Sequence, residues 1–532
     1  MAVACAAPCP FVHRAAKVRS TDSFRGFSMQ AQKALEPRTI PFWKHILQYI
    51  GYLLEGKQAN HKQNTIAALD GVRAIACLSV VTFHITLLST TALHAWTGLQ
   101  FFPLFSAVAY AGDTGINLFF VLSGFLLFLP YASAILYGKI WPSWRRFYLR
   151  RVFRILPAYY ASLLLMICLY SPKFLSWERW PDWLAFLTLF LDSSPTTYKQ
   201  VSGPLWTLAV EWQFYLILPL LALGIAFVVE RLAQRAPEAG TRLKLIIGCL
   251  LLLAIWGVFS RWLGLFLVSN PQPMSSPWYW PIGFFLFFGY GTTIPGLHGK
   301  FLENFALGML VSTLYIYTQR KNKRAETDST NGLGKRLRHL SPYLFIASLL
   351  WLLLLFAWKY AQSRGFASAL PLISYWYFPH IYYDIFAELG YGIGYSLLLL
   401  AVLFSGVRLK RIFEWKPLRW IGLLSYGLYM LHLNFFALCT AFLQQHPEWP
   451  ALLRYSTYWG WFAIFIIPCA FLLFVAVERP FIQLGTRLTT PATKHEAPAD
   501  KEPLVNQSNQ STPTLTASED ELSAPGKAHS HQ

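Results

Sequence analysis

Long apolar segments recur along almost the whole chain. Eleven of them lie near residues 72–93, 114–137, 155–171, 205–229, 245–268, 281–297, 301–319, 342–360, 386–407, 420–443 and 457–477. Each is compared with the roughly 20 residues that a membrane-crossing helix needs. Hydrophobic residues make up 55% of the chain and charged residues only 13%, far from the balance of a soluble protein. The sequence therefore predicts an all-α, polytopic membrane protein.

Basic residues fall in short clusters between the apolar segments. Four clusters lie at Lys139–Arg154, Arg231–Lys244, Arg320–Arg338 and Arg408–Arg419. Lys and Arg are enriched on the cytoplasmic side of membranes, so an even number of crossings should separate the second cluster from the third. The segment 281–297 contains several Gly and Pro residues and is interpreted as re-entrant or external. We therefore expect about ten transmembrane helices, with both termini cytoplasmic.

The formal net charge of +20 could indicate nucleic-acid binding. The basic residues form no single stripe or domain, so they are interpreted as a topology signal, with the lipid bilayer as partner and no nucleic acid. The seven cysteines form no disulfide framework and no CxxC metal pattern, and we expect no bound metal. The predicted location is the plasma (inner) membrane, as a multi-pass integral protein.

Both ends of the chain differ in composition from the apolar middle. Residues 1–65 are predicted to be a cytoplasmic extension, in which the stretch IPFWKHILQYIGYLLEG has the spacing of an interfacial amphipathic helix. Residues 66–485 hold the apolar segments and form the predicted membrane domain. Residues 486–532 are rich in Pro, Ser, Thr and charged residues and are predicted to be a disordered cytoplasmic tail.

The first apolar segment begins with LDGVRAIACLSVVTFH, residues 69–84. Arg73 and His84 are eleven residues apart, which in a helix places them on one face, roughly 16 Å apart along the axis. Asp70 lies close to the same face. The stripe therefore runs from an Asp–Arg pair at the cytoplasmic end of the helix to an imidazole near the middle of the bilayer.

An ionisable side chain at that depth needs a partner or a cavity. His84 could simply hold two helices together through a hydrogen bond. It is also suited to act as the general base that removes a proton from a hydroxyl group. The spacing to Arg73 favours the second interpretation, because a cation at the cytoplasmic end could hold an anionic cosubstrate whose reactive end reaches the base.

Several motifs resemble those of the acyltransferase-3 family, integral membrane enzymes that move acyl groups from acyl-CoA to hydroxyl groups, commonly on sugars. The arginine and histidine of the family's first helix match Arg73 and His84. Further resemblances follow in family order at Gly115–Leu126 (GINLFFVLSGFL), Arg151–Arg154 (RVFR), Leu205–Tyr215 (LWTLAVEWQFY), Gly422–His432 (GLLSYGLYMLH) and Glu478–Phe481 (ERPF). The ordered set spans about residues 66 to 485.

Two features depart from the family pattern. Trp212 follows Glu211 where relatives often carry a second acid, which puts a paired-carboxylate role there in doubt. Some relatives also append an extracytoplasmic esterase-like domain. The final fifty residues show no such nucleophile block, so the resemblance implies direct transfer.

The resemblance implies a set of site residues. Catalytic roles fall to His84, Asp70, Arg73 and Glu211. Arg73, Arg151, Arg154 and Ser123 are the predicted acyl-CoA contacts, and Asn117, Trp206, Tyr215 and His432 are the predicted acceptor contacts. Asn117 and Ser123 are six residues apart, so they should point to opposite sides of their helix. Structural alternatives exist for each motif: glycine packing in FFVLSGFL, lipid binding by the arginine run, a helix-end ion pair for Glu211 and helix packing for His432.

The predicted function is a membrane O-acyltransferase that moves an acyl group, expected to be acetyl, from cytosolic acyl-CoA to a hydroxyl of a saccharide or glycosylated acceptor. Acyl-CoA would be a cosubstrate, with no tightly bound cofactor. One alternative is a proton-coupled transporter, since mid-membrane ionisable residues and glycine breaks also suit a carrier. Another is an acyltransferase-like scaffold or receptor without activity.

Overall fold

The structure is a computed structural model that describes residue 51 and residues 67–91, 103–194, 196–235, 238–269, 300–324, 332–364 and 380–490. Every regular element in these ranges is helical. Most of the predicted extension before residue 66 and of the tail after residue 485 lies outside the described residues, as does the predicted re-entrant segment 281–297. The last described helix ends at Thr489.

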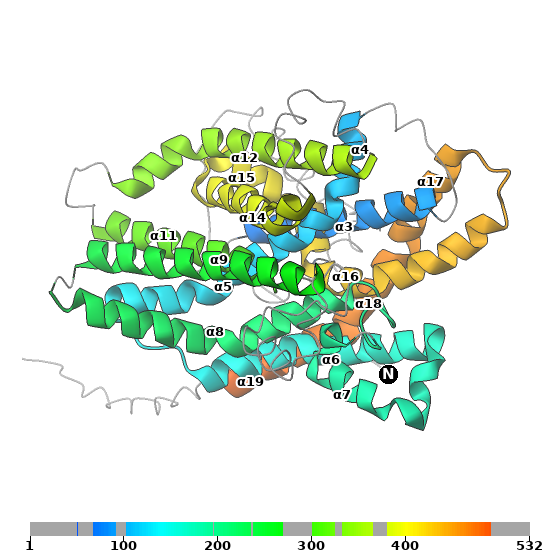
Figure 1. The fold of residues 1–532 in the computed structure, drawn as a ribbon, viewed down its shortest axis with the longest axis horizontal. Helices are drawn as coiled ribbons and strands as arrows, with labels where there is room; N and C mark the ends of the chain where they lie inside the picture. Colours follow the sequence, from blue (N-terminus) through cyan, green and yellow to red (C-terminus); the bar gives the residue numbers. More distant parts are fainter. Residues whose placement is uncertain are drawn as a thin grey trace, which may run out of the picture. The chain divides into compact units, whose positions relative to one another are not determined.

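The long helices follow the predicted apolar segments (Figure 1). Their bounds are α3 Ala68–Thr91, α5 Gly115–Tyr137, α6 Trp144–Tyr170, α8 Leu205–Leu232, α9 Ala239–Ser269, α11 Leu302–Arg324, α12 Leu333–Arg364, α14 His380–Phe404 and α16 Lys416–Gln444. Shorter helices are α4 Pro103–Tyr110, α7 Trp180–Thr188, α15 Val407–Phe413, α17 Ala451–Trp461, α18 Ile467–Leu473 and α19 Arg479–Thr489. Within the described ranges, nine helices are long and apolar enough to cross a membrane.

The tenth predicted segment, 301–319, is also helical and forms α11, but it is not among those nine. It packs against α5, α9 and α14. Its polar residues Glu303, Asn304, Ser312 and Thr313 are fully buried. Because these side chains face neighbouring helices, they lower the average hydropathy of α11 without exposing it to polar surroundings.

Small residues allow the central helices to pack closely. Gly124 of the FFVLSGF motif lies on α5 where an added Cβ would collide with the backbone carbonyl of Phe305 in α11. Gly422 of α16 lies equally close to the carbonyl of Asp70 in α3. Close backbone approach through glycine is a common mode of helix association in membranes. The motif glycines thus bring α5 onto α11 and α16 onto α3.

The last apolar segment is one run of helix, from Ala451 to Thr489, that is interrupted twice. Phe462–Ile466 and Phe474–Glu478 are π-helical turns on either side of α18. Pro468 lies in the first turn of α18. Each π turn adds a residue to the helix and shifts the face presented after it, which places Glu478 in a buried position.

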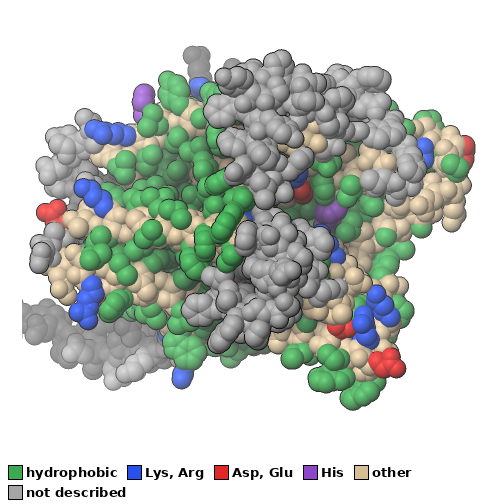
Figure 2. Space-filling view, viewed as in Figure 1, with side chains coloured by type: hydrophobic (Ala, Val, Ile, Leu, Met, Phe, Trp, Pro, Cys, Tyr) green, Lys and Arg blue, Asp and Glu red, His purple; other side chains and the backbone are tan. Residues whose placement is uncertain are grey.

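Apolar side chains also cover the outside of the helices. Figure 2 shows hydrophobic residues spread over α8, α9 and α12, where Leu220, Leu252 and Leu350 are each more than 60% exposed. A soluble protein rarely exposes apolar surface on this scale, whereas helices facing lipid must do so. The chain is a multi-pass integral membrane protein.

Candidate active site

Two histidines from distant parts of the chain meet between α3 and α16. The Nε2 atom of His432 lies 3.1 Å from the Nδ1 atom of His84, and the ring centroids are 4.9 Å apart. His432 is fully buried, whereas His84 is partly exposed. The predicted general base therefore has an imidazole partner, and the residue predicted to bind acceptor contacts the base itself.

Backbone carbonyl groups determine the proton positions on both rings. His84 Nδ1 lies 3.0 Å from the carbonyl oxygen of Val80, and His432 Nδ1 lies 3.0 Å from that of Leu428. Because a carbonyl oxygen can only accept a hydrogen bond, each neutral ring is assigned its proton on Nδ1. The Nδ1–H of His84 is then shared with His432 Nε2. The Nε2 lone pair of His84 remains available as a base.

A hydroxyl pair connects the histidines to α8. The ring of Tyr429 lies 5.8 Å from that of His432, and its hydroxyl is hydrogen-bonded to the hydroxyl of Thr207 at 2.8 Å. Both groups are buried. Glu211 follows Thr207 by one helical turn on α8. The second part of the site therefore begins about one turn away from the histidine pair.

Glu211 is held by two hydroxyl groups. Ser123 of α5 and Tyr215 of α8 both donate to Glu211 Oε1. Three predicted site residues, assigned to different roles, thus form one cluster. Among the described residues, Glu211 makes no hydrogen bond to His84, so the position that orients the base is occupied by His432 instead.

The predicted acyl-CoA contacts gather around this carboxylate. Arg73, Arg151 and Arg154, here called the arginine group, lie within electrostatic range of one another, and Arg73 and Arg151 also of Glu211. Nε of Arg151 is buried without a hydrogen-bond partner in the described chain. Neither Arg151 nor Arg154 forms an ion pair with another described residue.

Asp70 and Arg73 form the pair that the sequence predicts. The Arg73 guanidinium lies 3.5 Å from the Asp70 carboxylate. Arg419, at the start of α16, lies 3.9 Å from the same carboxylate. Asp70 therefore links α3 to α16 at the end opposite the histidines, and Arg419 is a member of this region that sequence reasoning did not identify.

Asn117 and Ser123 point to opposite sides of α5, as their spacing predicts. Asn117 donates to Glu388 of α14 at 2.5 Å and to Asn304 of α11 at 3.5 Å. Trp206 packs toward Phe301, with ring centroids 5.8 Å apart. The structure therefore places these two predicted acceptor contacts in a different region from His84.

That region contains a buried ion-pair network that sequence reasoning missed. Arg261 of α9 lies 2.5 Å from Glu303 of α11, and Lys300 pairs with Asp192. Burial lowers the pKa of the Lys300 ammonium, and the adjacent Asp192 carboxylate opposes that shift. Isolated acids within apolar segments were the available signal, because ionisable side chains at membrane depth require partners.

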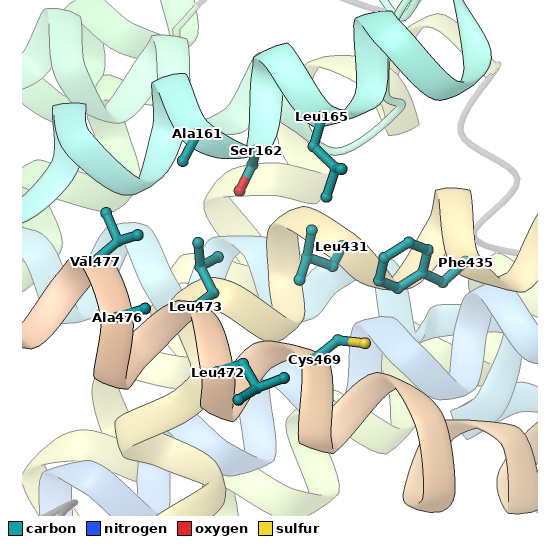
Figure 3. A pocket seen from close by; sticks show the side chains of 10 residues that line it. All are labelled: Ala161, Ser162, Leu165, Leu431, Phe435, Cys469, Leu472, Leu473, Ala476 and Val477. Atoms are coloured by element: carbon teal, nitrogen blue, oxygen red, sulfur yellow. The ribbon is translucent and has the colours of Figure 1, made fainter.

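One apolar groove lies away from the site. It has a volume of about 340 Å³ and lies between α6, α16 and the last helical run (Figure 3). Ser162 is its only hydroxyl-bearing residue, and the lining also includes Leu431 and Cys469. Among the described residues, no group of three or more His, Cys, Asp or Glu side chains could hold a metal ion.

Comparison with known proteins supports the resemblance seen in the motifs. The family model for the acyltransferase domain matches residues 66–477, and the chain belongs to this acyltransferase-3 family. A Bacillus subtilis (strain 168) protein named putative peptidoglycan O-acetyltransferase YrhL is 26% identical over 396 residues, covering 70% of this chain and 49% of that protein.

A second relative is the Listeria monocytogenes protein named peptidoglycan O-acetyltransferase OatA. It is 25% identical over 450 residues, covering 81% of this chain and 58% of that protein. The chain thus spans about half the length of the curated relatives that it matches. No solved structure matches the chain.

Proposed function

We propose that this protein is an O-acetyltransferase that moves an acetyl group from acetyl-CoA to a hydroxyl group of a saccharide. The observation that carries the proposal is the histidine pair: His84 has a base atom without a hydrogen bond, and its ring is held at Nδ1 by Val80 and His432. It shares one helix with Arg73, which belongs to the arginine group.

The arginine group suits the phosphates of coenzyme A. Arginine binds phosphate through two parallel N–H donors, and Arg151 has a buried donor without a partner in the described chain. Arg154 is exposed at the surface of α6 and would meet the phosphates first. With the phosphates there, the pantetheine arm would extend along α3, where about 16 Å separates Arg73 from His84.

In the proposed reaction, the acceptor hydroxyl gives its proton to Nε2 of His84 while its oxygen attacks the thioester carbon. A C–O bond forms, the C–S bond breaks, and coenzyme A leaves as a thiolate. The proton on His84 then neutralises the thiolate, so the ring returns to its starting state. His432 Nε2 accepts the Nδ1–H of His84 throughout and stabilises the imidazolium that forms.

The acceptor class rests on the relatives. Both are named peptidoglycan O-acetyltransferases, and their similarity covers most of this chain. We propose that this chain likewise acetylates a saccharide, with acetyl-CoA entering from the cytosolic end, where the basic residues of α6 and α12 lie. A protein that moves a solute without consuming acetyl-CoA would instead support the transporter alternative.

The test is acetyl transfer by purified protein in detergent. Wild type, His84→Ala and His84→Gln are incubated with radiolabelled acetyl-CoA and a panel of oligosaccharides, and coenzyme A release and labelled product are measured. We expect His84→Ala to lower transfer by roughly 10²- to 10⁴-fold, the usual contribution of a general base.

A matched control separates chemistry from folding. His446 is partly exposed, is paired with Glu448 and lies beyond the end of α16. His446→Ala should therefore retain transfer. Full activity in folded His84→Ala would contradict the proposed base, and no coenzyme A release by wild type with any acceptor would contradict the proposed function.

A further inference from the structure

We propose that Asp113, Lys359, Tyr110 and Phe83 form a binding subsite for the sugar ring of the acceptor, next to His84. The inference rests on the proposed function, because it specifies where the acceptor of that reaction binds. Sequence reasoning assigned acceptor binding to other residues, namely Asn117, Trp206, Tyr215 and His432. The subsite instead brings together the 3-10 turn Ala111–Thr114, the end of α12 and the histidine-bearing part of α3.

An ion pair forms the polar side of the subsite. Lys359 Nζ lies 2.5 Å and 2.6 Å from the two carboxylate oxygens of Asp113. The side chains remain 34% exposed for Asp113 and 20% exposed for Lys359. The buried pair Arg261–Glu303 is at most 5% exposed. The Asp113–Lys359 pair is therefore partly accessible, and a carboxylate has more acceptor positions than one ammonium group can occupy.

Aromatic rings lead from this pair to the base. Phe83 and His84 have ring centroids 5.1 Å apart, Phe83 and Tyr110 are 6.2 Å apart, and Tyr110 and Tyr360 are 6.3 Å apart. All three contacts are edge-to-face. Lys359 directly precedes Tyr360, so the series begins at the base and ends beside the ion pair.

The backbone holds these groups in place. Gly112 packs so closely on α3 that an added Cβ would collide with the carbonyl of Ser79. Thr114 is hydrogen-bonded to Tyr395 of α14 at 2.7 Å. Asp113 lies between these two anchors and is close enough to His84 for an electrostatic interaction. Its carboxylate is therefore fixed relative to the base.

This combination fits an uncharged pyranose ring. The C–H face of a sugar packs on aromatic side chains, whose rings supply rigid apolar area. Hydroxyl groups can donate to the Asp113 carboxylate and accept from the Lys359 ammonium, and hydrogen bonds to charged groups are the stronger kind. Since the ion pair is already balanced, the subsite favours a neutral ring over a charged one.

The experiment measures saccharide binding without acetyl-CoA, so it does not depend on the proposed transfer. The probes are fluorescently labelled chitopentaose and cellopentaose, added to purified full-length protein in detergent. We expect the wild type to bind at least one of them. Asp113→Asn and Tyr110→Leu should each weaken that binding by roughly tenfold, the effect of losing one favourable contact to a charged or aromatic group.

Glu448→Gln is the matched control, since it also removes one exposed acidic charge but lies at the far end of α16. It should leave saccharide binding unchanged. Thermal unfolding of each variant shows whether it is folded. Wild-type binding that Asp113→Asn and Tyr110→Leu both retain would overturn the subsite, as would failure of the wild type to bind either probe.

Failure of the subsite differs from failure of the proposed function. If wild type transfers acetyl to an oligosaccharide but the variants keep its KM, the function stands and the subsite is wrong. If wild type binds an oligosaccharide through Asp113 but never consumes acetyl-CoA, the subsite stands and the transferase proposal is wrong. A lowered melting temperature with unchanged binding would make the Asp113–Lys359 pair an anchor of α12 only.

Discussion

The arginine group and the buried ion-pair network are both charged regions among membrane helices, but their cations are placed differently. In the network, Arg261 lies on Glu303 and Lys300 lies on Asp192. In the arginine group, Arg151 has a buried donor without a hydrogen bond in the described chain. A buried cation with a direct partner stabilises the fold around it, whereas one without a partner is suited to an anion that arrives later.

The largest effect should come from breaking a pair in the network. Arg261→Met would leave the Glu303 carboxylate buried without its cation, and such changes cost about 3–5 kcal/mol. We expect a lower free energy of unfolding, measured by denaturant titration in detergent. The double variant Arg261→Met, Glu303→Met should recover part of the loss. An unchanged unfolding curve for the single variant would contradict a structural role for this pair.

A smaller effect, on binding instead of folding, is expected in the arginine group. Arg151→Ala should raise the KM for acetyl-CoA by roughly ten- to hundredfold, since a hydrogen bond to a charged group contributes about 1.5–3 kcal/mol. Its stability should change little, because no ion pair is broken. Arg145→Ala, which removes an exposed arginine of the same helix, is the control. Equal changes in KM for both variants would reduce the arginine group to a general surface charge.

The smallest effect concerns the hydroxyls that hold Glu211. Ser123→Ala removes one of two donors to this carboxylate, a loss of about 1 kcal/mol or roughly fivefold. We expect a modest decrease in kcat with the KM for acetyl-CoA retained. A kcat equal to that of the wild type would show that Tyr215 alone is enough to position Glu211.

Sequence patterns determined much of the fold and the local geometry of single helices. The apolar segments gave the long helices, and helical spacing placed Asp70 with Arg73 and set Asn117 and Ser123 on opposite sides of α5. These predictions succeed because they depend only on the geometry of one helix. Average hydropathy was less informative for α11, whose polar side chains face other helices.

Contacts between helices could not be predicted in the same way. His84 and His432 are 348 positions apart in sequence, and helical periodicity does not specify that α3 packs on α16. For the same reason, Glu388 was not recognised as the partner of Asn117, nor Lys359 as that of Asp113. Their signal was present as isolated charges within or beside apolar segments, but the pairing required the three-dimensional structure.

The central claim is that His84 performs the chemistry while the arginine group binds the cosubstrate. The most direct measurement is equilibrium binding of radiolabelled coenzyme A, combined with acetyl transfer, on the same preparations of His84→Ala and Arg151→Ala. We predict a crossed result, in which His84→Ala binds coenzyme A like the wild type but does not transfer, and Arg151→Ala binds weakly but transfers at saturating acetyl-CoA. Loss of both properties in both folded variants, or full transfer by His84→Ala, would contradict this division of roles.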